Sequence, residues 1–220
     1  HFQTLYGFWL CGEMVRGEAS PFHDPYQFSV SNQPGRIAVP ATGFPLSVIP
    51  AIAGGWTPPA FAWNLTGFVS LWLSMFLTFL LARRFTTSRW IAGGTALAVA
   101  CLPWTWTVMM DGGSTWLALP WIFTFLLGLD TAFRTGRMRG GVVGALALLF
   151  VGLADPHAAF CVLVFVPAWC ATVLLHRGGF NGRAGRDWKL ALVPLSPVAG
   201  AVLLGLVYDL TLAPPIPVTP

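Results

Sequence analysis

Long apolar runs limit this chain to a small set of folds. Four of them, 59–82, 90–110, 115–133 and 190–212, have about the roughly 20 residues that a helix needs to cross a bilayer. Two more apolar runs, 140–154 and 157–176, lie between the third and the fourth. Only 9% of the 220 residues are charged, against roughly 25% in an average soluble domain. The sequence therefore predicts an all-α, polytopic transmembrane helical bundle of about six spans.

The basic residues predict how such a bundle would be oriented. Ten of the 12 lysines and arginines fall in three connections between spans: Arg83, Arg84 and Arg89; Arg134, Arg137 and Arg139; and Arg177, Arg183, Arg186 and Lys189. The other side of the predicted membrane carries only Arg16 and Arg36. Cytoplasmic loops of membrane proteins carry an excess of Lys and Arg. We therefore expect an integral protein of a bacterial inner membrane, with the three basic connections in the cytoplasm.

The first 55 residues are the least membrane-like part of the chain. We expect residues 1–55 to form a structured extracytoplasmic first loop, and residues 56–220 to form the bundle. Apolar residues near the start share one side at helical spacing: Leu5, Phe8, Trp9 and Val15. This pattern predicts a short interfacial helix that ends at Gly17. Because the chain starts at His1 rather than Met, we expect it to be part of a longer protein.

Acidic residues and histidines gather on the predicted outer face. They come from the first loop and from two outer turns: Glu13, His23 and Asp24 with Tyr26; Asp111; and Asp155 with His157. A carboxylate beside an apolar wall can have its pKa raised enough to act as a general acid or base. The same side chains suit a divalent metal that carries phosphate oxygens. The alternative is ordinary turn and cap chemistry, because Asp before Pro or Gly commonly accepts backbone hydrogen bonds.

Prolines, glycines and tryptophans add expectations about packing. Prolines within or beside spans predict kinked helices: Pro103, Pro120, Pro167, Pro194 and Pro197. Small residues predict close helix contacts at Gly93–Gly94 and at Gly140, Gly141 and Gly144. Six tryptophans near the outer interface predict an aromatic belt, or alternatively stacking platforms for a sugar or an isoprenoid chain: Trp9, Trp56, Trp63, Trp104, Trp106 and Trp116.

The order of features over residues 1–135 resembles the GT-C superfamily of polytopic glycosyltransferases, which use polyprenyl-phosphate sugar donors. The matching pieces are Gly17 to Phe22, Pro45 to Pro50 leading into Ala62 to Asn64, Leu81 to Thr86 with Ser88 to Ala92, and Leu102–Pro103. The family's catalytic carboxylate sits at the very start of the first outer loop, a point upstream of this chain, which would make the chain a truncated or degenerate member.

The resemblance implies transfer of a sugar from a lipid-phosphate donor at the outer membrane face. Asp24 or Glu13 would be the catalytic base. The implied substrate-binding residues are His23, Tyr26, Asp111, Asp155 and His157, with a divalent metal as an optional cofactor. Membrane lipid and the polyprenyl-phosphate sugar would be the partners.

A non-catalytic structural subunit of a larger membrane complex, of respiratory or photosynthetic type, is the alternative, with other membrane subunits as partners. A transporter is less favoured, because no predicted span carries a charge near its midplane. Nucleic acid is not an expected partner, because the chain has no basic run and no RNA-binding motif.

Overall fold

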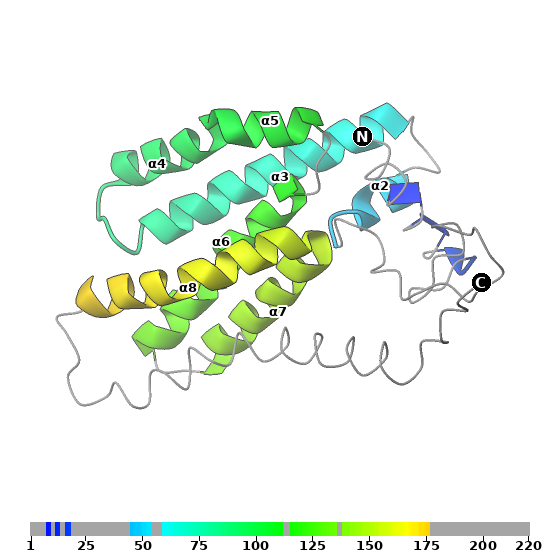
Figure 1. Cartoon of the computed structure of the whole chain (residues 1–220). Helices are drawn as coiled ribbons and strands as arrows, with labels where there is room; N and C mark the ends of the chain where they lie inside the picture. The colour runs from blue at the N-terminus through cyan, green and yellow to red at the C-terminus, as the bar shows by residue number, and fades with distance from the viewer. Residues whose placement is uncertain are drawn as a thin grey trace, which may run out of the picture.

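The computed structural model describes residues 8–9, 12–13, 16–18, 45–53, 59–111, 115–135 and 138–176. Its regular elements are all helices (Figure 1). They are α2 (Val48–Ala53), α3 (Pro59–Ala82), α4 (Arg89–Cys101), α5 (Pro103–Asp111), α6 (Thr115–Thr135), α7 (Met138–Ala154) and α8 (Pro156–His176). The prediction of an all-α chain is confirmed for these residues. The predicted span 190–212 lies outside them.

Among the described residues, two helices are long and apolar enough to cross a membrane. They are Phe61–Ala82 within α3 and Thr115–Thr135, which is α6. The apolar stretches of α7 and α8, Met138–Ala154 and His157–Val173, are shorter. The prediction of a six-span bundle is therefore matched in part: the described spans are helical, and two of the described helices are long enough to cross a membrane.

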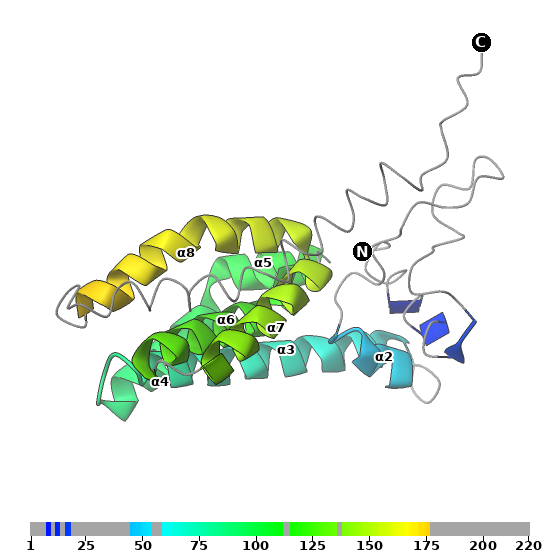
Figure 2. The ribbon, with the colours of Figure 1, turned by 90° about the horizontal axis from the view of Figure 1, so that it is seen from below.

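Helix α5 continues in the direction of α4, and otherwise the helices from α3 to α8 alternate in direction, so most of their connections gather at two ends of the molecule (Figures 1 and 2). One end holds the connections α3–α4 and α6–α7, and here Arg134 Nη2, in the last turn of α6, donates to the Arg84 carbonyl at 3.0 Å. We call it the basic end, defined by Arg83, Arg84, Arg89, Arg134 and Arg139. The opposite end holds the starts of α3, α6 and α8, and we call it the Asp155 end.

The predicted single span 90–110 is instead two helices, α4 and α5, because Pro103 interrupts it. Pro103 has no N–H to donate to the Val99 carbonyl. Leu102, the residue before the proline, takes the extended conformation that this position favours, with φ −58° and ψ 129°. The Val99 carbonyl accepts instead from Thr105 Oγ1 at 3.1 Å and from the Leu102 N–H at 3.4 Å. A buried side chain of α5 thus satisfies the group that the proline leaves free.

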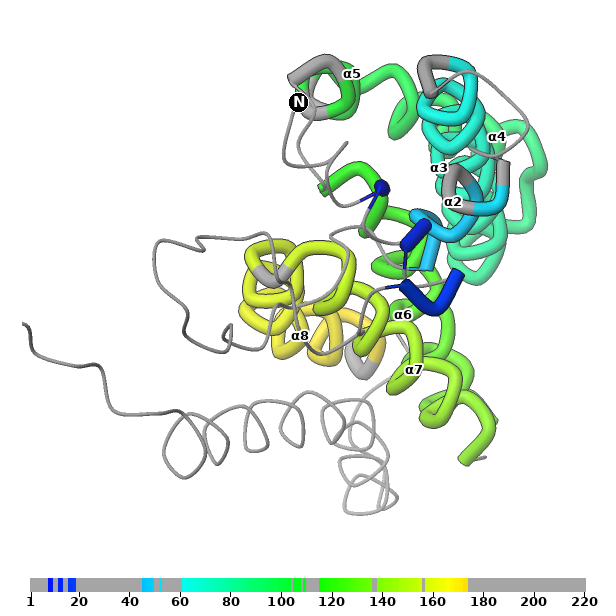
Figure 3. Tube along the Cα trace, turned by 90° about the vertical axis from the view of Figure 1, so that its right-hand side faces the viewer, coloured from blue at the N-terminus to red at the C-terminus, as the bar shows by residue number. Residues whose placement is uncertain are grey.

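Helix α6 lies at the centre of the described bundle. Seen along the helices, it sits between α3 and the pair α7 and α8 (Figure 3), and it contacts all three. The core around it is formed by fully buried apolar side chains, among them Phe125, Leu129, Leu148 and Val151. The inward face of α3 carries small hydroxyl-bearing residues at a spacing of four. They are Thr66, Ser70, Ser74 and Thr78, and all are buried.

Helices α6 and α7 approach each other closely through small residues. A Cβ added at Gly128 would lie 2.6 Å from the Gly144 nitrogen, and one at Gly140 would lie 2.5 Å from the Ala132 nitrogen. This confirms the expected close contact at Gly140 and Gly144. Among the described residues, the expected close contact at Gly93–Gly94 is not found, because a Cβ at either position would meet nothing within 4 Å.

The helical residues near the N-terminus end at Gly17, as predicted. Gly17 has a positive φ of 77°, which L-residues with a side chain rarely adopt. The Glu18 N–H donates to the Glu13 carbonyl at 2.8 Å, the backbone bond of a Schellman helix end. Further along, the short apolar piece 46–53 contains α2.

Candidate functional site

The predicted site residues are described to different extents. Glu13, Asp155 and His157 have described side chains, and Asp111 is the last residue of the helix α5. His23, Asp24 and Tyr26 lie outside the described residues. The geometry of the candidate site is therefore built from the Asp155 end and from the part of the first loop that packs there.

Asp155 occupies the turn between α7 and α8 and is only 6% exposed. Its Oδ1 accepts from the backbone N–H groups of His157 at 2.9 Å and of Ala158 at 3.3 Å, which makes it the N-cap of α8. Its Oδ2 accepts from Thr115 Oγ1, on the first residue of α6. The carboxylate also lies at the positive end of the α8 dipole. Asp155 thus ties the starts of two helices together.

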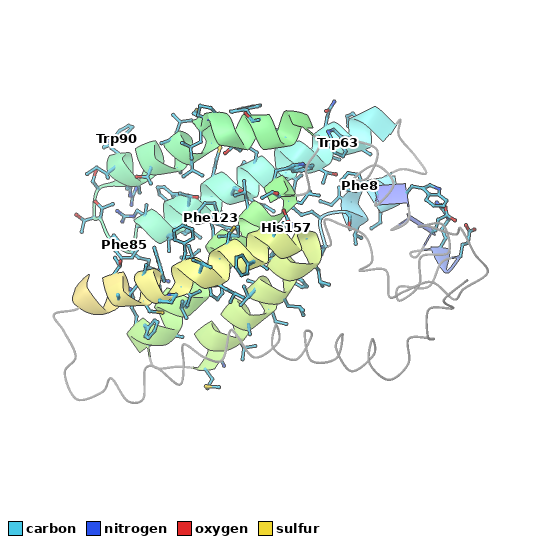
Figure 4. All side chains as sticks on the ribbon, in the orientation of Figure 1. Phe8, Trp63, Phe85, Trp90, Phe123 and His157 are labelled. Carbon is cyan, nitrogen blue, oxygen red and sulfur yellow. The ribbon has the colours of Figure 1, made fainter. Side chains whose placement is uncertain are left out.

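His157 lies at the surface beside this buried carboxylate. Its side chain is 97% exposed, and its Nδ1 lies 3.8 Å from Asp155 Oδ1. Figure 4 shows His157 at the start of α8, at the same end of the molecule as Phe8 and Trp63. A protonated imidazole here would be paired with Asp155 while it still faces outward. Of this pair, His157 is the member open to a ligand.

Glu13 belongs to a small charged cluster with Arg16 and Glu18. Arg16 Nη2 donates to Glu13 Oε1, and Arg16 Nε lies 3.6 Å from Glu18 Oε2. A hydrogen bond with the Glu18 carboxyl, assisted by Arg16, holds the pKa of Glu13 below its ordinary value. The same bond with Glu13 raises the pKa of Glu18. A carboxylate with a low pKa is a weak base near neutral pH.

An aromatic cluster holds two short described pieces of the first 55 residues against the bundle. The Phe8 and Trp63 rings lie 5.2 Å apart, and the Trp63 and Trp116 rings meet edge to face at 5.6 Å. Leu46, from the far side of the loop, joins the same cluster. Phe8 and Leu46 are 7% and 5% exposed. Phe8 and Leu46 are therefore both anchored on α3 and α6, at the Asp155 end.

This cluster bears on the expectations about tryptophan. Trp116 is only 2% exposed and Trp63 is half-buried, so these two rings pack the protein interior. Trp9 and Trp106, at 43% and 44% exposed, present their rings at the surface. Of the six tryptophans predicted near the outer interface, only Trp9 and Trp106 among those with described side chains could therefore form an interfacial belt or a stacking platform.

A second polar cluster lies at the basic end. Asp130 is fully buried, and both of its oxygens accept from Arg134 Nε, at 2.9 and 2.7 Å. Arg84 Nε lies 3.9 Å from Asp130 Oδ2. The Arg134 guanidinium carbon sits 5.8 Å from the Phe85 ring centre, and Phe85 meets Trp169 of α8 edge to face at 5.7 Å. The cluster fastens α6 to the α3–α4 connection and to α8.

Sequence reasoning missed three parts of this arrangement. Thr115 gave no signal beyond its place at the start of an apolar run. The contact of Phe8 with Trp63 joins residues far apart in the sequence, which no local pattern indicates. The pair of Asp130 and Arg134 did carry a signal, because opposite charges four residues apart share one face of a helix.

Within the residues that the structure describes, no three His, Cys, Asp or Glu side chains gather closely enough to hold a metal ion. Comparison of the chain with family models, with curated proteins and with solved structures gives no match.

Proposed function

We propose that this chain is part of a GT-C-like membrane glycosyltransferase, which moves a sugar from a polyprenyl-phosphate donor to an acceptor at the outer membrane face. The observation that carries the proposal is the placement of the first loop. Phe8 and Leu46 anchor its flanks on the pair Trp63–Trp116, at the end where Asp155 and His157 lie. In this proposal the acids Glu13 and Asp24 act at the same end of the molecule as His157.

The six-span bundle in a bacterial inner membrane is the setting of this proposal. Helix α3 turns a row of large apolar side chains outward, with Phe68 68%, Trp72 56% and Phe76 48% exposed. Helix α8 does the same with Phe160 69% and Phe165 70% exposed. Apolar surface of this extent suits lipid contact. With the basic end in the cytoplasm, the Asp155 end and residues 1–55 face outward.

The proposed reaction needs a base and groups that hold the donor. The base removes the proton from the acceptor hydroxyl, the acceptor oxygen bonds to the anomeric carbon, and polyprenyl phosphate leaves with the electrons of the broken bond. Asp24 is the preferred base, because the pKa of Glu13 is held low. His157, His23 and Tyr26 would bind donor oxygens and Asp111 would line the site, while Asp155 positions His157. A divalent metal, where used, would draw ligands from the first loop and help carry the phosphate charge.

Transfer of labelled sugar from a polyprenyl-phosphate donor by the chain in proteoliposomes tests this assignment. We expect Asp24→Asn to slow transfer by about 10²–10⁴-fold, as for loss of a general base. Glu13→Gln is expected to change it little, and Glu18→Gln is its matched control. If Asp24→Asn, Glu13→Gln and Asp155→Asn all leave the rate unchanged, the assigned roles are wrong.

A non-catalytic subunit of a larger membrane complex is the second candidate. The observation in its favour is that both Asp155 oxygens are taken up in joining helix ends, and Glu13 is paired with Arg16. Purification in mild detergent separates the two candidates. Stoichiometric co-migration with other subunits, and no polyprenyl phosphate in the extracted lipid, would favour the subunit.

A further inference from the structure

The start of α4 presents an exposed apolar surface at the basic end. Trp90 is 91% exposed, more than any other large apolar side chain in the described part of the chain, and Leu97 is 55% exposed. Residues 90, 94 and 97 lie on one face of the helix, because they follow the i, i+4, i+7 spacing. Figure 4 shows Trp90 at the edge of the molecule, beside the α3–α4 connection.

Between these two side chains the helix surface is bare. Residue 94 is glycine, and a Cβ placed there would meet nothing within 4 Å. Gly93, its neighbour, is equally open. A glycine inside a helix costs about 0.5–1 kcal/mol relative to alanine, and within the described part of the chain no close helix contact accounts for it. The face formed by Trp90, Gly94 and Leu97 thus has a gap at Gly94 between two exposed apolar side chains.

Positive charge adjoins this face without a nearby described acid to neutralise it. Arg89 is exposed at the first position of α4. The preceding loop holds Arg83 in place, since Arg83 Nη1 donates to the carbonyls of Thr86 and Thr87. Asp130, the acid at this end among the described residues, is buried and bonded to Arg134.

We propose that this surface binds one anionic glycerophospholipid of the cytoplasmic leaflet. Its phosphate contacts Arg89 and the loop that carries Arg83, and one acyl chain lies on Gly94 between Trp90 and Leu97. Basic segments at the membrane surface attract anionic headgroups, and tryptophan rings favour the headgroup level. The inference rests on the membrane placement proposed above and does not depend on glycosyl transfer.

Native mass spectrometry of the full chain in neutral detergent tests the site, with dioleoylphosphatidylglycerol and dioleoylphosphatidylcholine as the two probes. We expect the anionic lipid to bind more tightly. Arg89→Gln should weaken its binding about fivefold, the effect of one arginine near a membrane surface. Gly94→Leu should also weaken it, because the leucine side chain would occupy the bare face.

Arg139→Gln is the matched control, because it removes the same charge from the same end on a different helix. The proposal is overturned if Arg139→Gln weakens binding as much as Arg89→Gln, since the attraction would then be diffuse. It is also overturned if glycerol 3-phosphate binds as well as the lipid, or if Trp90 crosslinks to a second copy of the chain. Far-ultraviolet circular dichroism of Gly94→Leu, compared with the unaltered chain, checks that this variant still folds. The rate of glycosyl transfer by the Arg89→Gln variant is measured separately, because it tests the proposed function and not the lipid site.

Discussion

The Ser70 hydroxyl of α3 donates a hydrogen bond of 2.7 Å to the main-chain carbonyl of Trp116 in α6. In an unbroken helix that carbonyl would accept from the N–H of residue 120, but residue 120 is proline and has none. The bond therefore supplies a donor from a neighbouring helix to a carbonyl that the proline frees. Prolines inside membrane helices are tolerated where a neighbour restores the lost bond in this way.

Removing the Ser70 hydroxyl should destabilise the protein through this carbonyl. Ser70→Ala leaves the buried Trp116 oxygen without its donor, and we expect a loss of about 1 kcal/mol in the free energy of unfolding. Pro120→Ala returns an N–H to the same oxygen. In a Pro120→Ala background, Ser70→Ala should cost clearly less. Unfolding in mixed micelles at rising SDS measures all four members of this double-mutant cycle.

Ser74→Ala is the matched control for that cycle. The Ser74 hydroxyl donates to the Ser70 carbonyl of its own helix, at 2.8 Å. Its loss should be nearly neutral and should not depend on residue 120. Equal costs for Ser70→Ala with and without Pro120 would contradict the account of the freed carbonyl.

The pair Asp130–Arg134 should respond unequally to loss of either partner. Arg134→Gln leaves a fully buried carboxylate with Arg84 Nε only at 3.9 Å, and we expect it to cost about 3 kcal/mol. Asp130→Asn leaves Arg134, whose side chain is 29% exposed and can turn toward water, so about 1.5 kcal/mol is expected. Arg139→Gln, an exposed arginine on α7, serves as control. A larger cost for Asp130→Asn in SDS unfolding would contradict this ordering.

Alanine at Gly140 should push α6 and α7 apart. Its Cβ would lie 2.5 Å from the Ala132 nitrogen and 2.7 Å from the Gly128 oxygen, and rigid backbone atoms cannot give way. We expect a loss of about 1–3 kcal/mol, as for overpacked cores. Gly152→Ala on the same helix is the matched variant, because its Cβ would lie 4.0 Å from the Ala159 Cβ. It should gain about 0.5–1 kcal/mol from helix propensity.

Helix placement was predictable because hydrophobic runs of helical length have few alternatives. The predicted run 59–82 coincides with α3, Pro59–Ala82. The run 90–110, predicted as one span with a kink at Pro103, is divided into two helices, α4 and α5. Whether a proline kinks or divides a helix depends on how the freed carbonyl is satisfied, and Thr105 does so here from the far side of the break.

The candidate site was less predictable than the helices. The predicted topology puts Asp155 and His157 on the same face of the membrane, and the structure puts them side by side. The sequence could not tell that Thr115 occupies the second oxygen of Asp155, because that contact joins residues 40 positions apart. The sequence analysis left open that an Asp before Pro simply caps a helix. The observed hydrogen bonds of Asp155 follow this capping pattern.

The carboxyls of Glu13 and Glu18 should titrate on opposite sides of the ordinary value of 4.5, because they share one hydrogen bond. The lowered pKa of Glu13 stabilises the folded N-terminal segment above 4.5, and this contribution is lost as the pH falls through the folded pKa. The raised pKa of Glu18 acts in the opposite sense, so its contribution is present below 4.5 and is lost as the pH rises through the folded pKa.

Carbon-13 NMR of the two labelled carboxyls measures both titrations, read as the behaviour of a coupled pair. Glu18→Ala removes the largest cause of the Glu13 shift and should raise the pKa of Glu13 toward 4.5. Arg16→Gln should raise it less, because Arg16 is a smaller cause. If Glu18→Ala leaves the Glu13 titration where it was while Arg16→Gln moves it, the arginine and not the shared hydrogen bond controls this carboxyl. Glu13 would then depend on its ion pair alone for its ionised state.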